Sequence, residues 1–254
     1  MKIITWNVNG IRASRKNNYF DKVLKLETDL LCLQEVKMSQ ESDIGKHVFP
    51  YVYLKMSQRK GRNGVAILSK YPASKVYNEI GDEKVDGDGR FIAIEVKDIL
   101  IINCYVPHGK RDKSDLLYKI FYLKKIYEFY SVIKHKYKKV IILGDFNIAA
   151  ENIDLERYRQ NKNNTMFTEN ERSCLLELKG LGFADCFREL NPLERCYSWW
   201  PYAFNARERN LGWRIDYIYV NQTMLCNVKT CRYLNEFYGS DHCPLFAEIS
   251  FDGE

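Results

Sequence analysis

Short apolar runs that alternate with helical patterns constrain the fold of this chain more than any other feature of its sequence. Six runs of five to eight residues have the length and composition of buried strands. Their alternation with helical segments is typical of a layered α/β domain. No low-complexity linker divides residues 1–254, so we expect a single domain. The six runs are "KIITW", "LLCLQ", "VAILS", "FIAIEV", "ILIINCYV" and "KVIILGD".

The longest helical pattern covers residues 114–136, where apolar side chains recur at helical spacing. Ser114 and Asp115 are the candidate N-caps of this helix, because short polar side chains accept hydrogen bonds from the first turn. Two polar segments, 57–64 ("SQRKGRNG") and 81–90 ("GDEKVDGDGR"), are expected to be a basic turn and a charged loop.

A second helix is predicted to begin after Thr168. Thr168 and Glu171 stand three residues apart, at the spacing of a capping box in which each side chain bonds to the backbone beside the other. Gly180 or Gly182 is expected to end the helix, since glycine readily adopts the left-handed backbone of a helix C-terminus.

Charge and cysteine content narrow the class of protein. Lys and Arg number 39 against 33 Asp and Glu, and the net charge of +6 fits a polyanion-binding protein without requiring one. The eight cysteines form no CxxC pair and no zinc-finger spacing, which indicates a reducing compartment. The N-terminal "MKIITWNVNG" lacks the apolar run of a signal peptide, and no run approaches a membrane span. We therefore expect a soluble protein, cytoplasmic or nucleoid-associated in a prokaryote, or nuclear in a eukaryote.

The segment "GWRIDYIYV" (212–220) reads as a strand that carries an acid on its apolar face. Alternation with a period of two places Asp216 beside Ile218 and Val220. A carboxylate in that position is costly unless another group pairs with it. Arg214 lies on the same predicted face and is one candidate partner.

Other predicted strands also have a polar or ionisable residue at or just beyond one end. Ligand sites in layered α/β sheets form at strand ends and in the loops beyond them. Any one such residue alone is more simply read as a turn or solvated residue, but the whole set together favours a site. The set is Asn7, Asn9, Glu35, Tyr105, His108, Asp145, Asn147, Asp241 and His242.

This set allows a narrow chemistry. Glu35 with Asn9 and Asp241 would be a hard oxygen site suited to Mg²⁺ or Mn²⁺ rather than zinc. His242 with Asp216 would be an imidazole–carboxylate pair. This pairing would explain why Asp216 stands on an apolar strand face, since its carboxylate would orient the imidazole and stabilise its protonated form.

Asp145 is the candidate to orient or deprotonate a water, with Asn147 and Asn7 as neutral donors. No Ser or Cys is placed like a nucleophile, and no glycine-rich phosphate loop is present. The residues therefore predict metal-assisted hydrolysis of a phosphate ester.

Five motifs carry a resemblance to a known family. "WNVNGIR", "LCLQEVK", "LGDFNIAAENIDL", "NARERNLGWRIDY" and "GSDHCP" occur in the order and spacing of the exonuclease III class of AP endonucleases, within the endonuclease/exonuclease/phosphatase superfamily. The resemblance covers essentially the whole chain. It implies a four-layered α/β sandwich, in which two packed mixed β-sheets are flanked by helices and the site lies at one edge.

The resemblance also implies roles for individual residues. Glu35 would be the main metal ligand, with Asn9 and Asp241 supporting the metal site. Asp145 would activate the attacking water, and Tyr105 would touch the scissile phosphate or the leaving oxygen. The implied catalytic set is Asn7, Tyr105, Asp145, Asn147, Asp216 and His242, and the implied metal set is Asn9, Glu35, Asp145, Asn147 and Asp241.

The resemblance further implies a substrate, double-stranded DNA with abasic or 3′-blocked sites. Trp199, Trp213 and Ile215 would form an apolar slot for a flipped sugar that has no base. The same aromatics, taken alone, would be read as core or surface residues. Contacts to the DNA backbone would come from Arg12, Lys37, Arg62 in the 59–62 turn, Lys110, Asn161 and Asn164.

The implied activity is Mg²⁺-dependent cleavage 5′ to an abasic site, with 3′-end cleaning and some 3′–5′ exonuclease action, by a monomer. Asn9 stands where many eukaryotic members carry Asp, and Ala203 stands where some carry a bulky wedge. Lys110 sits near a position where some members use Arg.

Two other functions are compatible with part of this pattern. A superfamily phosphodiesterase or phosphatase with a non-DNA substrate would keep Glu35, Asp145 and His242 but not the tryptophan slot and the basic rim. A catalytically inactive nucleic-acid-binding module would have lost a metal or water-activating residue, and the sequence retains them all.

Overall fold

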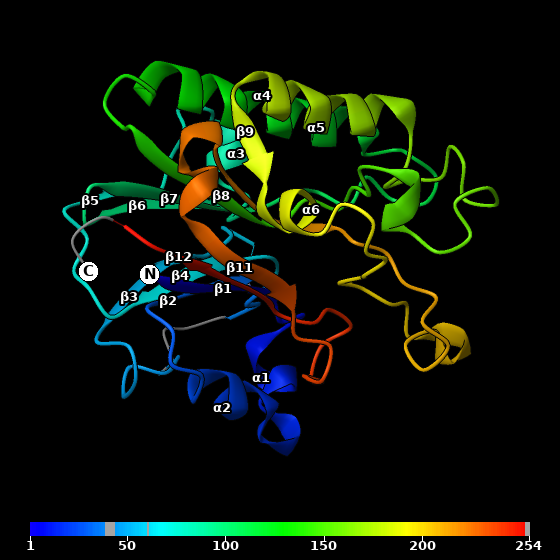
Figure 1. Cartoon of the computed structure of the whole chain (residues 1–254), viewed down its shortest axis with the longest axis horizontal. Helices are drawn as coiled ribbons and strands as arrows, with labels where there is room; N and C mark the ends of the chain where they lie inside the picture. The colour runs from blue at the N-terminus through cyan, green and yellow to red at the C-terminus, as the bar shows by residue number, and fades with distance from the viewer. Residues whose placement is uncertain (39–43, 60, 252–254) are drawn as a thin grey trace.

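Two six-stranded mixed sheets lie face to face at the centre of the protein (Figure 1). This computed structural model describes residues 1–38, 44–59 and 61–251. The strand order is β11-β12-β1-β2-β4-β3 in the first sheet and β5-β6-β7-β8-β10-β9 in the second. The strands of the first sheet are β1 (Lys2–Asn7), β2 (Leu30–Gln34), β3 (Tyr51–Lys55), β4 (Val65–Ser69), β11 (Val228–Tyr233) and β12 (Leu245–Ile249). Those of the second are β5 (Lys75–Tyr77), β6 (Phe91–Val96), β7 (Ile99–Tyr105), β8 (Lys139–Asp145), β9 (Phe183–Asp185) and β10 (Asp216–Asn221).

Helices cover the outer faces of the two sheets, which completes four layers (Figure 1). In the orientation of Figure 1, α1 and α2 lie below the first sheet, and α4 and α5 lie above the second. The expected four-layered α/β sandwich is therefore confirmed. The helices are α1 (Ile11–Ser14), α2 (Tyr19–Leu24), α3 (Glu83–Asp86), α4 (Leu116–Ile133), α5 (Glu169–Gly180) and α6 (Cys186–Leu190). Among the helices that the structure describes, none is both long and apolar enough to cross a bilayer.

Alternating side chains fill the three spaces between the layers. Along β7, Ile99 and Ile101 face the other sheet, whereas Leu100 and Ile102 face α4. A third cluster, which includes Trp6 on β1, packs the first sheet against α1 and α2. Central strands such as β2 and β7 are buried on both faces, which explains their nearly continuous apolar sequences.

The helix predictions are largely confirmed. Thr168 caps α5, and its capping box with Glu171 is formed in both directions. Asp115 is the N-cap residue of α4, but its side chain makes no capping bond and pairs with Lys110 instead. The predicted charged loop 81–90 was wrong in part, because Asp82 caps the short helix α3 within it.

The strand predicted over 212–220 was wrong in its first half. Strand β10 begins only at Asp216, and Arg214 lies in the preceding loop. Arg214 does not pair with Asp216: its fully buried guanidinium binds Asp154 Oδ1 at 2.7 Å and Asp185 Oδ2 at 2.7 Å. Backbone that is not a strand does not obey the period of two, so the expected shared face does not exist.

Strand register brings the predicted polar strand ends together at one edge. Asn7 ends β1 beside Gln34 of β2, and the parallel pair β7 and β8 ends with Tyr105 beside Asp145. Antiparallel β10 starts there, with Asp216 opposite Asp145. The ends of both sheets thus supply side chains to a single site.

Candidate active site

Asn7 joins the two sheets at the centre of the site. Its side-chain amide donates to Glu35 Oε1 at 2.9 Å and to Asp145 Oδ2 at 2.8 Å. Glu35 follows β2 of the first sheet, and Asp145 ends β8 of the second. One neutral, fully buried side chain therefore holds two carboxylates from different sheets in a fixed relation.

Asp145, Asp216 and His242 form a buried cluster beside Asn7. His242 Nδ1 lies 2.8 Å from Asp216 Oδ2, and its Nε2 lies 3.9 Å from Asp145 Oδ2. Burial alone would lower the pKa of His242, but the charges of Asp216 and Asp145 outweigh it and raise that pKa to about 10. The imidazole is therefore a cation at neutral pH and stands ready to bind an anion.

The same cluster also raises the pKa of Asp145, which favours the neutral form of this carboxyl. Burial, followed by the charge of Asp216, raises the pKa of Asp145 to about 7, although His242 opposes the shift. A carboxyl with that pKa exchanges a proton readily near neutral pH, as a general base requires. Asp216 Oδ1 is buried and has no hydrogen-bond partner among the described residues.

Glu35, Asn9 and Asp241 lie together on the first-sheet side of the site. Asn9 Nδ2 donates to Asp241 Oδ1 at 2.9 Å, and Trp199 Nε1 donates to Asp241 Oδ2 at 3.0 Å. Burial opposes ionisation of Glu35, yet the Lys37 charge and several hydrogen bonds lower the pKa of its carboxyl. These three residues supply the hard oxygen donors that Mg²⁺ prefers.

Lys37 lies inside this oxygen cluster. Its ammonium is 2.6 Å from Glu35 Oε2 and 2.6 Å from Asn9 Oδ1. The predicted contact of Lys37 with a DNA backbone stays a prediction beside these internal contacts. The ammonium acts as a stand-in cation, which shows that these oxygens fit a positive ion. The ligand atoms of Asp145, Asp216 and His242 also lie within 4.8 Å of one another, but they would be a second metal set only with the His242 imidazole deprotonated.

Tyr105 and Asn147 complete the predicted catalytic set. The Tyr105 hydroxyl hydrogen-bonds to Glu35, and burial followed by the Glu35 charge raises the pKa of Tyr105 well above its usual value. The phenol therefore remains a donor. Asn147 adopts a left-handed backbone (φ 52°). Its side-chain nitrogen Nδ2 donates to Asp145 Oδ2 at 3.1 Å and to Val106 O at 2.9 Å.

A cavity of about 370 Å³ is lined on one side by Trp199, whose indole donates to Asp241 and whose ring centroid lies 6.4 Å from that of His242. The Trp199 and Trp213 rings both line it and pack edge to face on each other, with centroids 6.5 Å apart. Ile215 does not line the cavity but is buried behind it, in the same core cluster as Met166. The lining residues are His108, Arg111, Asn161, Asn164, Thr165, Met166, Trp199, Pro201 and Trp213.

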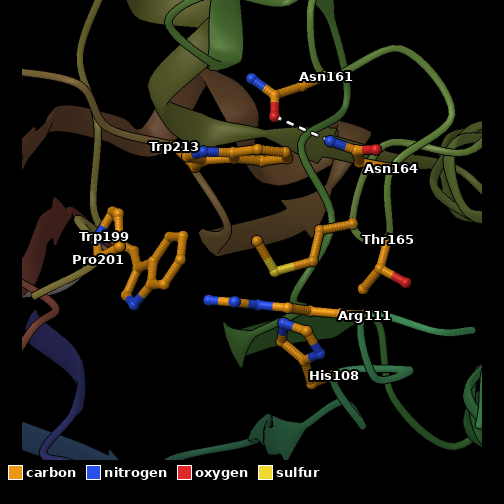
Figure 2. A pocket seen from close by; sticks show the side chains of 9 residues that line it. His108, Arg111, Asn161, Asn164, Thr165, Trp199, Pro201 and Trp213 are labelled. Carbon is orange, nitrogen blue, oxygen red and sulfur yellow. Dashed lines mark hydrogen bonds between the residues drawn. The ribbon is translucent and has the colours of Figure 1, made fainter. Parts of the chain in front are cut away.

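Arg111 is the main lining residue that the sequence did not reveal. Figure 2 shows its side chain above His108 and directed towards Trp199, while Asn161 and Asn164 hydrogen-bond to each other at the rim. The sequence prediction named the neighbouring Lys110, whose ammonium lies 3.0 Å from Asp115 and whose contact with DNA stays a prediction. No sequence signal distinguishes two adjacent cations in a turn, and none marked Met166.

A polar groove of about 620 Å³ extends from Tyr105 to the other side of His108. Arg62 is exposed there, as predicted for the basic turn, and Lys110 also reaches it. Arg90 stacks its guanidinium 4.3 Å from the Tyr105 ring centre and pairs with Asp88. Arg12 is exposed on α1 and follows the Asn9 loop closely.

Comparisons with known proteins find relatives that match nearly the whole chain. Residues 4–242 match the model of the Endonuclease/Exonuclease/phosphatase family. The chain is 36% identical to an exodeoxyribonuclease of Bacillus subtilis over 96% of this chain and 98% of that protein. It is 37% identical to the DNA repair nuclease APEX1 of Danio rerio over 96% of this chain and 81% of that protein.

Solved structures of similar proteins also superpose on nearly the whole chain. An AP endonuclease from Archaeoglobus fulgidus superposes with a TM-score of 0.88 at 31% identity and covers 99% of this chain and 100% of its own. The 3′ phosphatase NExo from Neisseria, bound to a product DNA hairpin, superposes with a TM-score of 0.90 at 30% identity, with the same coverage.

Proposed function

The chain belongs to the endonuclease/exonuclease/phosphatase family as a nuclease of the exonuclease III type, and we propose that it cleaves duplex DNA 5′ to an abasic site. We further propose that it cleans blocked 3′ ends and has some 3′–5′ exonuclease activity, with Mg²⁺ as its cofactor and Mn²⁺ as a substitute. The observation that carries the proposal is the Trp199–Trp213 cavity, which adjoins the His242–Asp216 pair. A superfamily member without a nucleic-acid substrate has no need of this slot.

The proposed reaction divides between the metal and the chain. Glu35, Asn9 and Asp241 would hold the ion, which supplies positive charge to the scissile phosphate. Asp145 would accept a proton from the attacking water, and its raised pKa suits that task. Protonated His242 would bind a phosphate oxygen and oppose the negative charge that grows in the transition state.

Neutral donors would orient the reacting groups. Asn7 and Asn147 both donate to Asp145, so they fix the direction of the proposed base. Asp216 would keep the imidazole of His242 protonated and in one orientation. Tyr105, a phenol whose pKa is raised, would donate to the scissile phosphate or the leaving oxygen.

The slot would select the substrate by volume and surface. A sugar without a base would fit in the cavity against the two tryptophan rings, whereas an intact nucleotide adds a ring that the slot would exclude. Arg62, Arg111 and the Asn161–Asn164 pair would contact the DNA backbone around it. Such contacts provide affinity without sequence readout. We propose that the enzyme acts as a monomer in the compartment that holds the cellular DNA.

A cleavage assay tests the proposal. The purified protein with Mg²⁺ is given a duplex with one tetrahydrofuran abasic analogue, an intact duplex and a duplex with a 3′-phosphate. We expect rapid incision of the abasic strand, release of the 3′-phosphate and little cutting of intact DNA. Inositol phosphates and sphingomyelin serve as the alternative substrates. Hydrolysis of either of these, with no incision of the abasic duplex, would refute the proposal.

A further inference from the structure

Lys119 on α4 and Glu171 on α5 form an ion pair in which both side chains are 0% exposed. Lys119 Nζ lies 2.6 Å from Glu171 Oε1. Burial lowers the pKa of Lys119, and the carboxylate only partly offsets this effect. A buried pair of this kind is weak evidence for stability, because two charges lose their water, and apolar residues of similar volume often do as well. The hydrogen bonds of the pair indicate another role.

The ammonium binds two loops that follow neighbouring strands. It donates to the carbonyl of Asn147 at 2.6 Å and to the carbonyl of His108 at 3.3 Å. Asn147 follows β8 and His108 follows β7. Asn147 has a left-handed backbone, which costs free energy unless its surroundings hold it in place. Lys119 is well placed to supply that restraint.

Glu171 extends the same network to the wall of the cavity. Its Oε1 also accepts from Met166 N at 2.9 Å, and its Oε2 accepts from Thr168 N at 2.9 Å. Met166 lines the cavity together with the tryptophans, and its carbonyl accepts from Ala149 N at 2.8 Å. The pair thus connects the loop of Asn147 with the slot through buried polar bonds.

We infer that Lys119 is a positioning residue for catalysis: its ammonium fixes the Asn147 peptide, and through it the Asn147 amide that orients Asp145. Lysine suits this position because one ammonium offers three donors, and here it reaches three separate segments. No apolar pair of equal volume could make these bonds. The inference rests on the role proposed above for Asn147.

A pair of variants separates positioning from mere stability. Glu171→Gln keeps the ammonium and its bond to Asn147, whereas Lys119→Met/Glu171→Gln removes the ammonium and leaves no unpaired charge. We expect Glu171→Gln to retain kcat within about threefold of wild type. Glu171→Gln leaves the buried ammonium without its carboxylate, so the double variant should melt no lower than Glu171→Gln. It should nevertheless lose about 100-fold in kcat, with KM changed less than about threefold, because misplacement of a catalytic group acts on the transition state.

Lys125→Met is the matched control. Lys125 lies on the same helix and pairs with Glu128 at 2.8 Å, but both side chains face solvent. Its loss should leave kcat and the melting temperature unchanged. If the double variant does not fold, Lys119→Gln/Glu171→Gln carries the same test, since the shorter amide cannot span from Asn147 to residue 171.

The result that would overturn the inference is a double variant whose kcat equals that of Glu171→Gln. A higher KM with an unchanged kcat would also overturn it. All rates are taken relative to wild type on a phosphodiester that the wild type cleaves, with bis(p-nitrophenyl) phosphate as the generic substrate. A failure of the abasic-site proposal therefore remains distinguishable from a failure of this one.

Discussion

Removal of the Trp213 indole tests whether the cavity selects abasic DNA. Trp213 forms one wall of the cavity and meets Trp199 at 6.5 Å and Phe167 at 6.5 Å. Its backbone exchanges hydrogen bonds with Trp199 in both directions at 2.9 Å, and these bonds survive substitution by Ala. Trp213→Ala should therefore enlarge the slot without releasing the loop.

The magnitude follows from the area that the indole covers. A sugar ring that buries roughly 50–100 Å² against the indole gains about 1–3 kcal/mol at 25 cal/mol per Å². Loss of that contact should reduce kcat/KM on abasic duplex by roughly 10- to 100-fold. Cleavage of intact duplex does not use the slot, so the ratio of abasic to intact cleavage should fall by the same factor.

The assay compares kcat/KM on abasic, intact and 3′-phosphate duplexes at several Mg²⁺ concentrations. Trp200→Ala is the control, because Trp200 is the sequence neighbour of Trp199 but packs against Arg207 outside the cavity. The dependence on Mg²⁺ should not change in either variant. An unchanged abasic-to-intact ratio in Trp213→Ala would refute the slot argument, and selectivity would then lie in how easily the damaged duplex bends.

Chelation should abolish cleavage, and Mg²⁺ or Mn²⁺ should restore it better than Ca²⁺; Glu35→Gln should lose most of the rate, whereas full activity in excess chelator would contradict the metal assignment. Asp145→Asn and His242→Asn should each cost several orders of magnitude in kcat while a gel-shift assay still detects duplex binding; wild-type rates in Asp145→Asn would remove it as the base. The pKa of His242, about 10 against an ordinary 6.5, means that its protonated form stabilises the fold fully below pH 6.5 and that this benefit is lost as pH rises towards 10. Asp216→Asn should lower that pKa, so the alkaline limb of the kcat profile should move to lower pH; an unmoved limb would separate Asp216 from His242. Duplex affinity should fall steeply with added salt and vary little with sequence, and a flat salt response would argue against backbone binding.

The sequence predicted the central strands because they are buried on both faces. The runs at β1, β2, β4, β6, β7 and β8 are continuously apolar, as fully buried strands require. Strands β3 and β5 were missed, since they are edge strands with exposed or half-exposed residues throughout, and β9 has only three residues. Strand β11 alternates buried and exposed residues too irregularly to stand out.

The site was predictable at strand ends and less so in loops. Asn7, Glu35, Asp145 and His242 meet as expected, because strand register fixes where each strand ends. The predicted pairing of Arg214 with Asp216 was wrong because the segment that holds Arg214 is not a strand. Loop side chains depend on backbone turns that sequence periodicity does not describe.

Lys37 and Lys110 illustrate this limit. Both have left-handed backbones, with φ values of 48° and 58°, and form ion pairs with Glu35 and Asp115 that the sequence pattern does not predict. The role of Lys119 was hidden for another reason. A lysine within an amphipathic helix is normally read as solvent-facing, and only the tertiary fold buries it.

The side-chain amide of Asn7 bonds one carboxylate from each sheet. The geometry of the site therefore depends on the position of the two sheets relative to each other. A slip of a few tenths of an ångström between the layers would stretch the bond to Glu35 or the bond to Asp145. Substitutions deep in the inter-sheet core, such as Ile101→Val, can therefore slow the reaction although they touch no reacting group. In a random mutant library, substitutions that lower kcat should therefore fall in the core between the two sheets as well as around the cavity.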